Sequence, residues 1–191
     1  MADPHISYKI KAALLYYWRY TRGFIALPET MVAWWIADIM AYKNGIVCEV
    51  EIKTTMPDMK NDINKKGKHE GYAKGLPIEY DYGFPLIHTP ELQGMQATLP
   101  PNLFYFCVPE SMVDKAKEYI MTLNKSYGLL SWRGGDHNIW GSIRVEKKAR
   151  RLHKELHPEE IIRKRSNYRL SAEVARCYEK LYYKEDDNAT K

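Results

Sequence analysis

The sequence has few cysteines and no long apolar run, and both absences narrow the class of protein. Only 3 cysteines occur in 191 residues, far apart and without a Cys-x-x-Cys pair, which argues against a disulfide framework or a structural zinc site. No apolar segment approaches the roughly 18 residues that a membrane span needs. The start, Met-Ala-Asp-Pro-His, lacks the pattern of a signal peptide, so we expect a cytoplasmic protein without a membrane partner.

A large net charge is absent as well, although the charge is unevenly spread. The hydrophobic fraction of 45% excludes a disordered chain, and the length suits one domain with a real core. The net charge is only +5, but basic residues concentrate between positions 144 and 169. Such a segment favours a polyanionic partner. Because Glu155, Glu159 and Glu160 interrupt it, a solvated helix face is the alternative interpretation.

Hydrophobic periodicity and turn residues predict a mixed α/β chain. We expect helices over residues 7–22, 57–66 and 112–123, and strands over residues 24–27, 32–42, 46–54, 103–108, 127–132 and 139–145. Residues 28–30 are expected to be a break, residues 67–69 to interrupt or end a helix, and residues 75–102, rich in proline and glycine, to be a long loop. The order predicts an α/β sandwich with a mixed sheet over residues 1–152 and a basic helical extension over residues 153–191, broken near position 157 or 166.

A tight turn should bring three charged residues together. Asn44-Gly45 is a strong signal for a type I′ hairpin, and a two-residue loop there pairs Lys43 with Ile46. Counting outward puts Asp38 opposite Glu51, and alternation puts Lys53 on the same face as Glu51. Like charges directly opposite each other destabilise a sheet, so we expect a cation between the two carboxylates.

Two carboxylates on adjacent strands suit Mg²⁺ or Mn²⁺, because magnesium takes few protein ligands and keeps several waters. Asp38 and Glu51 are the expected ligands, with the backbone carbonyl of Ile52 as a third. Lys53 beside a metal-bound water would position or help deprotonate it, and burial near the metal would lower the pKa of Lys53. Together these parts predict a phosphodiester hydrolase. The alternative is an ordinary half-exposed strand, and Glu49 is the alternative ligand in another register.

These residues resemble the signature of the PD-(D/E)xK nuclease superfamily, an acidic residue on one strand and (D/E)-x-K on the next. More of the chain is similar to the MmcB-like DNA-repair family and related phage proteins. The similar segments, between positions 36 and 152, are Ala37-Asp38, residues 49–54, 58–68, 104–110 and 128–130, and a closing strand at residues 144–149.

The resemblance implies a restriction-endonuclease-like α/β/α sandwich and a metal-dependent DNA nuclease of phage or bacterial origin, acting in repair, recombination or processing. Many such nucleases form homodimers, for which the loop 75–102 or the C-terminal segment could serve. The superfamily often carries an upstream glutamate, and Glu29 is the nearby candidate. The rival hypothesis is a non-catalytic nucleic-acid-binding or interaction protein on the same fold.

Several further residues are candidates for contacts around this site. Lys68, His69 and Tyr72 follow the site strands and could reach a phosphate, or could lie in an exposed loop. Asp58 and Asp62 could add to the metal shell, although an acid in the first turn of a helix is already explained by the helix dipole. Trp34 and Trp35 are expected in the core, with base stacking as the alternative. The expected DNA-phosphate contacts are Lys147, Lys148, Arg150, Arg151, Arg163, Lys164 and Arg165.

Overall fold

The computed structural model describes residues 6–32, 35–65, 67–74, 100–134, 142–160, 162–164 and 166–167. The chain divides into two compact units, Met1–His157 and Pro158–Lys191. Most of the predicted loop, residues 75–99, lies outside the described residues, as do Trp34, Arg165 and positions 139–141 of one predicted strand. No helix in the described part of the chain is long and apolar enough to cross a membrane.

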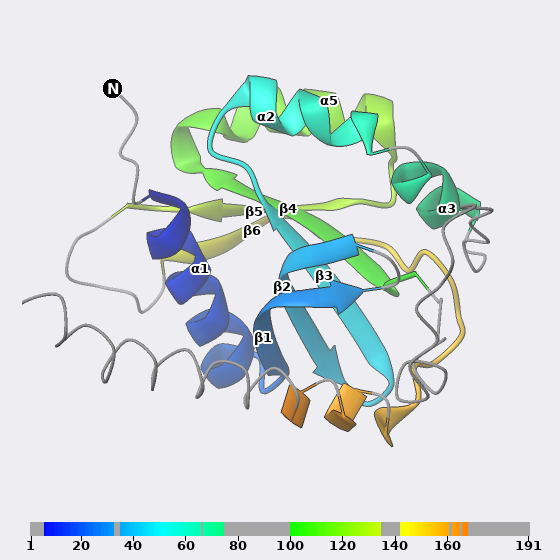
Figure 1. Ribbon diagram of the computed structural model, residues 1–191. Helices are drawn as coiled ribbons and strands as arrows, with labels where there is room; N and C mark the ends of the chain where they lie inside the picture. Colours follow the sequence, from blue (N-terminus) through cyan, green and yellow to red (C-terminus); the bar gives the residue numbers. More distant parts are fainter. Residues whose placement is uncertain are drawn as a thin grey trace, which may run out of the picture. The chain divides into compact units, whose positions relative to one another are not determined.

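A six-stranded mixed sheet forms the centre of the first unit, and its strands lie in sequence order (Figure 1). The first three strands pair antiparallel, β4 runs parallel to both β3 and β5, and β6 is antiparallel to β5. This confirms the predicted α/β class with a mixed sheet. The strands are β1 (Ile25–Val32), β2 (Trp35–Lys43), β3 (Ile46–Ile52), β4 (Leu103–Pro109), β5 (Gly128–Trp132) and β6 (Ile143–Lys147).

Helices cover both faces of the sheet (Figure 1). Helix α1 (Ile6–Tyr16), continued by a π-helical turn over Tyr17–Thr21, packs on one face with Val50 and Cys107, and we call this the α1 face. The opposite face, called the α5 face, carries Phe104 and Phe106 beneath α2 (Met56–Asn61), α3 (Lys68–Lys74) and α5 (Val113–Leu123). Because side chains alternate along a strand, β4 and β5 supply both cores.

The β2–β3 hairpin has the predicted turn and register. Asn44 and Gly45 have positive φ angles of 51° and 78°, as a type I′ turn requires. Lys43 pairs with Ile46, and the ladder continues in step to the pair Ile39–Val50. The register therefore places Asp38 and Glu51 at facing positions, one step beyond that last pair.

The predicted break at residues 28–30 is wrong, whereas the helix after β3 is interrupted, as one of the two alternatives for residues 67–69 predicted. Residues 28–30 are part of β1, because only Glu29, with φ of 46°, departs from the strand while Pro28 and Thr30 stay in register with β2. The edge position of β1 tolerates the proline. Helix α2 is followed by a 3-10 turn over Asp62–Asn64, and beyond Gly67 a new helix, α3, begins at Lys68 instead of a loop.

The predicted helical extension from position 153 is also wrong in its first part. Residues 148–158 contain no helix, and among the described residues beyond them the helical ones are 159–160, 162–164 and 166–167. Two residues that are distant in sequence hold the backbone of this stretch instead. The Asn102 side-chain amide donates to the Glu155 carbonyl at 2.6 Å, and the His157 N–H donates to the Gly45 carbonyl at 2.8 Å. These long-range partners replace the hydrogen bonds that a helix would make.

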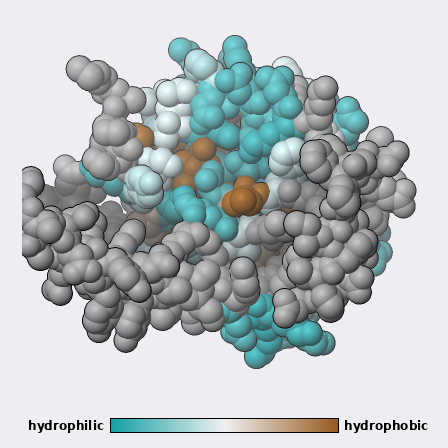
Figure 2. All heavy atoms as spheres, viewed as in Figure 1, coloured by the Kyte–Doolittle hydropathy of each residue, from teal (hydrophilic) through white to brown (hydrophobic). Residues whose placement is uncertain are grey.

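On the side of the molecule drawn in Figure 1, the described residues present a mostly hydrophilic surface. Apolar atoms of described residues are confined to small spots on this side (Figure 2). Small apolar spots are ordinary on a protein surface, so this side offers no argument for a large hydrophobic contact by the described residues.

Candidate functional site

A row of charged side chains from β3 is buried on the α5 face. Glu49, Glu51 and Lys53 are only 0%, 3% and 6% exposed, although they alternate with the apolar residues of the α1 face. The half-exposed strand considered as an alternative is therefore wrong, because helices cover both faces of β3. Buried charges are expensive unless they are paired, so their partners decide what the site can do.

Asp38 lies where the β2–β3 ladder ends. Its Oδ2 accepts a hydrogen bond from the Ile52 N–H at 2.8 Å, so the side chain replaces a backbone partner there. The N–H and C=O of one strand residue point to the same edge, which places the Ile52 carbonyl on the side of Asp38. Burial and the nearby Glu51 carboxylate raise the pKa of Asp38. In the described part of the chain, no lysine or arginine forms an ion pair with Asp38.

Lys53 lies between carboxylates from β3 and α2. Its Nζ is 2.8 Å from Asp62 Oδ1, 3.6 Å from Glu51 Oε2 and 3.9 Å from Asp58 Oδ1. Burial alone would lower the pKa of Lys53, but Asp62 and Glu51 outweigh burial and raise it. The predicted lowering of this pKa is therefore not found, because the carboxylates surround the ammonium.

Lys68 is the buried cation between two glutamates. Its side chain is fully buried, with Nζ 2.7 Å from Glu49 Oε1 and 2.5 Å from Glu51 Oε1. Burial tends to raise the pKa of Glu51, yet Lys68 and Lys65 lower it overall. Lys68 thus neutralises Glu49 and Glu51 and is not the cation expected between Asp38 and Glu51.

Tyr72 and Glu49 form the inner end of the cluster. The fully buried Tyr72 hydroxyl donates to Glu49 Oε2 at 2.6 Å. Burial raises the pKa of Glu49 to about 6, against the opposing effect of Lys68. Lys68 and Tyr72 thus point into the protein, so the expected phosphate contact is not open to either of them in this arrangement.

Asp62 is more central to the cluster than its place at a helix start suggested. It is buried, its Oδ1 lies 2.7 Å from Lys65 Nζ as well as near Lys53, and its Oδ2 lies 3.0 Å from His69 Nε2. His69 Nδ1 is in turn 2.8 Å from the Tyr127 hydroxyl. Burial would raise the pKa of Asp62, but the His69, Lys68 and Lys53 side chains hold it far below its usual range. The i, i+4 spacing of Asp58 and Asp62 after Lys53 was the available sequence signal.

Glu29 does not join the cluster. Its side chain is 44% exposed and pairs with Lys11 of α1 at 2.9 Å. The upstream glutamate of the resembled superfamily therefore has no counterpart in this position.

The predicted phosphate-binding residues divide by their surroundings. Lys147 lies in β6, and its ammonium donates to the backbone carbonyls of Lys125, at 2.7 Å, and Tyr127, so it serves the fold. Lys148, Arg150 and Arg151 are exposed. In the second unit, Arg163 and Lys164 form i, i+4 pairs with glutamates at 2.7 and 2.9 Å.

The donor set decides which ion could be held here. Among the described residues, no group of three or more His, Cys, Asp or Glu side chains is arranged to hold a metal ion. Asp38 and Glu51 with the Ile52 carbonyl form a smaller oxygen set, which suits an ion that keeps most of its waters, as Mg²⁺ does.

Comparison with known proteins adds no relative to this picture, since no family model, no curated protein and no solved structure matches the chain.

Proposed function

We propose that the protein is a Mg²⁺- or Mn²⁺-dependent DNA nuclease with a PD-(D/E)xK site formed by Asp38, Glu51 and Lys53. The observation that carries the proposal is the hairpin register, which puts the acidic residue of β2 and the Glu-x-Lys of β3 at facing positions. All three side chains are buried or half-buried. Helices on both faces of a mixed sheet also support a restriction-endonuclease-like sandwich.

The metal ligands would be the Asp38 and Glu51 carboxylates and the Ile52 carbonyl. A bound Mg²⁺ or Mn²⁺ supplies polarisation of the phosphate and activation of water. Asp38 is well suited because it has a raised pKa and no ion pair with a described lysine, so a cation would relieve its unfavourable charge. Lys68 holds Glu51 through Oε1, whereas Oε2 faces Lys53 and the partly exposed Lys65. Lys65 can therefore turn away when a cation binds.

Lys53 would act as a donor rather than a base. Its raised pKa keeps it protonated at neutral pH, since Asp62 and Glu51 favour the charged ammonium. A protonated Lys53 can hold the attacking water by hydrogen bonds and offset the negative charge that develops on the phosphate. Asp62 positions this ammonium at 2.8 Å from the 3-10 turn that follows α2.

DNA would reach the site with help from exposed cations. Lys148, Arg150 and Arg151 are exposed in the segment after β6 and carry no ion pair in the described part of the chain. Because phosphate neutralisation releases counterions, DNA affinity should fall steeply with added salt.

The second candidate function is a non-catalytic nucleic-acid-binding or interaction protein on the same fold. The observation in its favour is that Lys53, Lys65 and Lys68 already neutralise the carboxylates without any metal. A cluster of this kind can exist for the architecture alone. This function predicts DNA binding, or binding to another partner, with no metal requirement.

A cleavage assay separates the two functions. Labelled single-stranded, duplex and branched DNA would be incubated with Mg²⁺, Mn²⁺ or EDTA and with wild type, Lys53→Ala or the control Lys60→Ala, whose side chain is exposed on α2. We expect metal-dependent cleavage by wild type and the control, and none by Lys53→Ala, which should still bind DNA. Asp38→Asn, nearly the same shape, tests the metal ligand without loss of a buried cation.

The results have opposite meanings for the two candidates. Cleavage that persists in Lys53→Ala would rule out its assigned role. Binding without cleavage by wild type would favour the non-catalytic function.

A further inference from the structure

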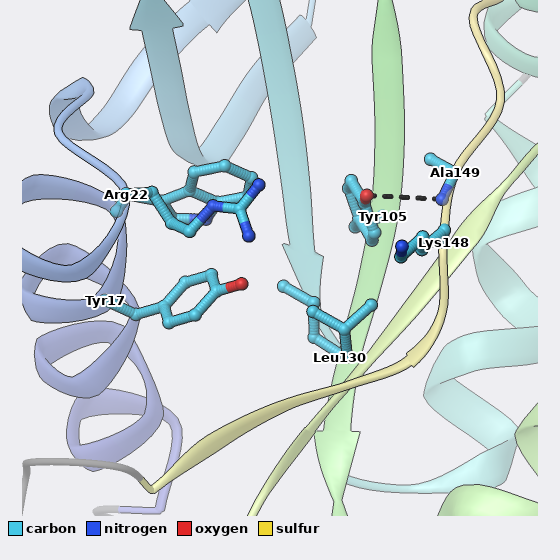
Figure 3. A pocket seen from close by; sticks show the side chains of 8 residues that line it. Tyr17, Arg22, Tyr105, Leu130, Lys148 and Ala149 are labelled. Carbon is cyan, nitrogen blue, oxygen red and sulfur yellow. Dashed lines mark hydrogen bonds between the residues drawn. The ribbon is translucent and has the colours of Figure 1, made fainter.

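A separate pocket of about 230 Å³ opens on the α1 face of the sheet (Figure 3). It is formed where the end of the first helical segment approaches β4, β5 and the segment after β6. Its lining includes Tyr17, Trp18, Arg22, Tyr105, Lys148 and Ala149.

The pocket is distinct from the carboxylate cluster because the sheet lies between them. Tyr105 belongs to the core of the α1 face, whereas its strand neighbours Phe104 and Phe106 belong to the α5 face. Glu49, Glu51 and Lys68 lie on the α5 face, so a ligand in the pocket would not touch them. A function of the pocket therefore does not depend on Asp38, Glu51 or Lys53, although Lys148 also belongs to the proposed DNA contacts.

Two cations from different elements border the pocket. Arg22 follows the π-helical turn and Lys148 follows β6, and Figure 3 shows them on opposite sides of the same space. Neither forms an ion pair in the described part of the chain. Two unneutralised cations that border one space favour an anion of about two negative charges, such as a phosphate monoester.

The tyrosine hydroxyls add donors in the same space. The Tyr105 hydroxyl accepts the Ala149 N–H at 3.2 Å, which leaves its own O–H free to donate (Figure 3). The Tyr17 hydroxyl points into the space from the other side. Gly128 fixes this arrangement, because a Cβ there would lie 2.2 Å from the Tyr105 ring and 2.8 Å from Ala149 N.

Aromatic rings supply a surface for a flat group. Trp18 is 4% exposed and packs edge-on against Tyr105, with ring centroids 6.1 Å apart. Its Nε1 is buried and has no hydrogen-bond partner among the described residues, and a buried unpaired donor calls for an explanation.

We propose that this pocket binds a nucleotide group, with its phosphate monoester between Arg22 and Lys148 and its base against Tyr17 and Tyr105. The volume lies below the roughly 300–1,000 Å³ of typical ligand pockets, which limits the ligand to at most one nucleotide and excludes a longer segment. The nucleotide could be a free monophosphate or the phosphorylated end of a DNA strand, since both carry the same chemistry.

Calorimetric titration of the full chain tests the proposal. The probes are adenosine monophosphate, adenosine, inorganic phosphate, and a short oligonucleotide with either a 5′-phosphate or a 5′-hydroxyl. Wild type should bind adenosine monophosphate more tightly than it binds adenosine or phosphate. Arg22→Gln and Lys148→Gln should each weaken this binding at least tenfold, whereas Lys115→Gln, an equal charge change on exposed α5 surface, should not.

The choice of probes distinguishes the two sources of the ligand. Preference for the 5′-phosphorylated oligonucleotide over the mononucleotide assigns the pocket to strand ends, and the reverse assigns it to free nucleotides. Absence of nucleotide binding by wild type, or equal weakening by Lys115→Gln, overturns the proposal. Lys53→Ala should retain nucleotide binding, so failure of the nuclease proposal would leave this result unchanged.

Discussion

The two faces of the central sheet are made from the same strands but hold different interiors. Along β3, Cys48, Val50 and Ile52 enter an apolar core beneath α1, while Glu49 and Glu51 enter a charge cluster beneath α2 and α3. Alternation of this kind usually marks a strand with one face in solvent. Here the second face is buried because Lys65, Lys68 and His69 bring the opposite charges and hydrogen-bond donors. The difference shows that a polar strand face can be an interior when a neighbouring segment supplies partners.

The two interiors also differ in how much their burial contributes to the free energy of folding. Apolar burial stabilises by roughly 25 cal/mol per Å², whereas a buried ion pair roughly breaks even against hydrophobic replacements. A cluster with this cost is typical of functional sites, where pKa values are shifted away from their ordinary range. Variants on either face test this difference between the two interiors.

The largest expected loss of stability comes from removal of the buried ammonium of Lys68. Lys68→Met leaves Glu49 and Glu51 buried without their shared partner, which should lower the free energy of unfolding by about 3–5 kcal/mol. Urea denaturation monitored by circular dichroism would measure it. The matched control, Lys115→Met on exposed α5 surface, should stay within about 0.5 kcal/mol of wild type. Equal stability of the two variants would show that the cluster is not held by Lys68.

A smaller loss of stability is expected from a substitution on the α1 face. Gly128→Ala would place a methyl group 2.2 Å from the Tyr105 ring, which must move, and overpacking of this kind costs about 1–3 kcal/mol. The same change should weaken nucleotide binding in the pocket. Gly134→Ala is the control, because its nearest contact, the Trp132 ring, is 3.3 Å away. Thermal unfolding and calorimetry would measure both effects, and unchanged binding by Gly128→Ala would separate Tyr105 from the pocket's function.

The smallest effect should be a gain in stability. Asp38→Asn keeps an acceptor for the Ile52 N–H but removes a carboxylate that faces Glu51, so the metal-free variant should be more stable by up to about 1 kcal/mol at neutral pH. An acid whose pKa is raised by folding destabilises the folded state above that pKa. The gain should therefore disappear as the pH falls through the raised pKa toward the ordinary value of 3.8. Unfolding measured in EDTA across this pH range checks it, and a less stable variant at neutral pH would contradict the assumed repulsion.

The hairpin could be predicted from the sequence because its turn and register depend only on residues that are close together in the chain. Asn44-Gly45 fixes the turn type, and the turn fixes the register out to Ile39 and Val50. The class of fold followed from the same kind of pattern, with strand and helix periods that needed no long-range knowledge.

The partners of the carboxylates could not be found in this way. Lys68 lies 17 residues from Glu51, and Tyr127 lies 58 residues from His69, so their meeting depends on how α3 and β5 pack. From the sequence, Asp62 is explained as an acidic residue in the first turn of a helix, because the sequence does not show which residues contact it in the folded protein. The segment after β6 was predicted to be helical for a related reason: Asn102 and Gly45, far away in sequence, hold its backbone.

The central claim is that Asp38 and Glu51 bind a divalent cation, and Mn²⁺ titration followed by electron paramagnetic resonance tests it most directly. Wild type and Asp38→Asn would be titrated in parallel, with free Mn²⁺ measured from its signal. We predict one site in wild type and at least tenfold weaker binding in Asp38→Asn. Equal Mn²⁺ binding by the two proteins, or none by wild type, would contradict the claim.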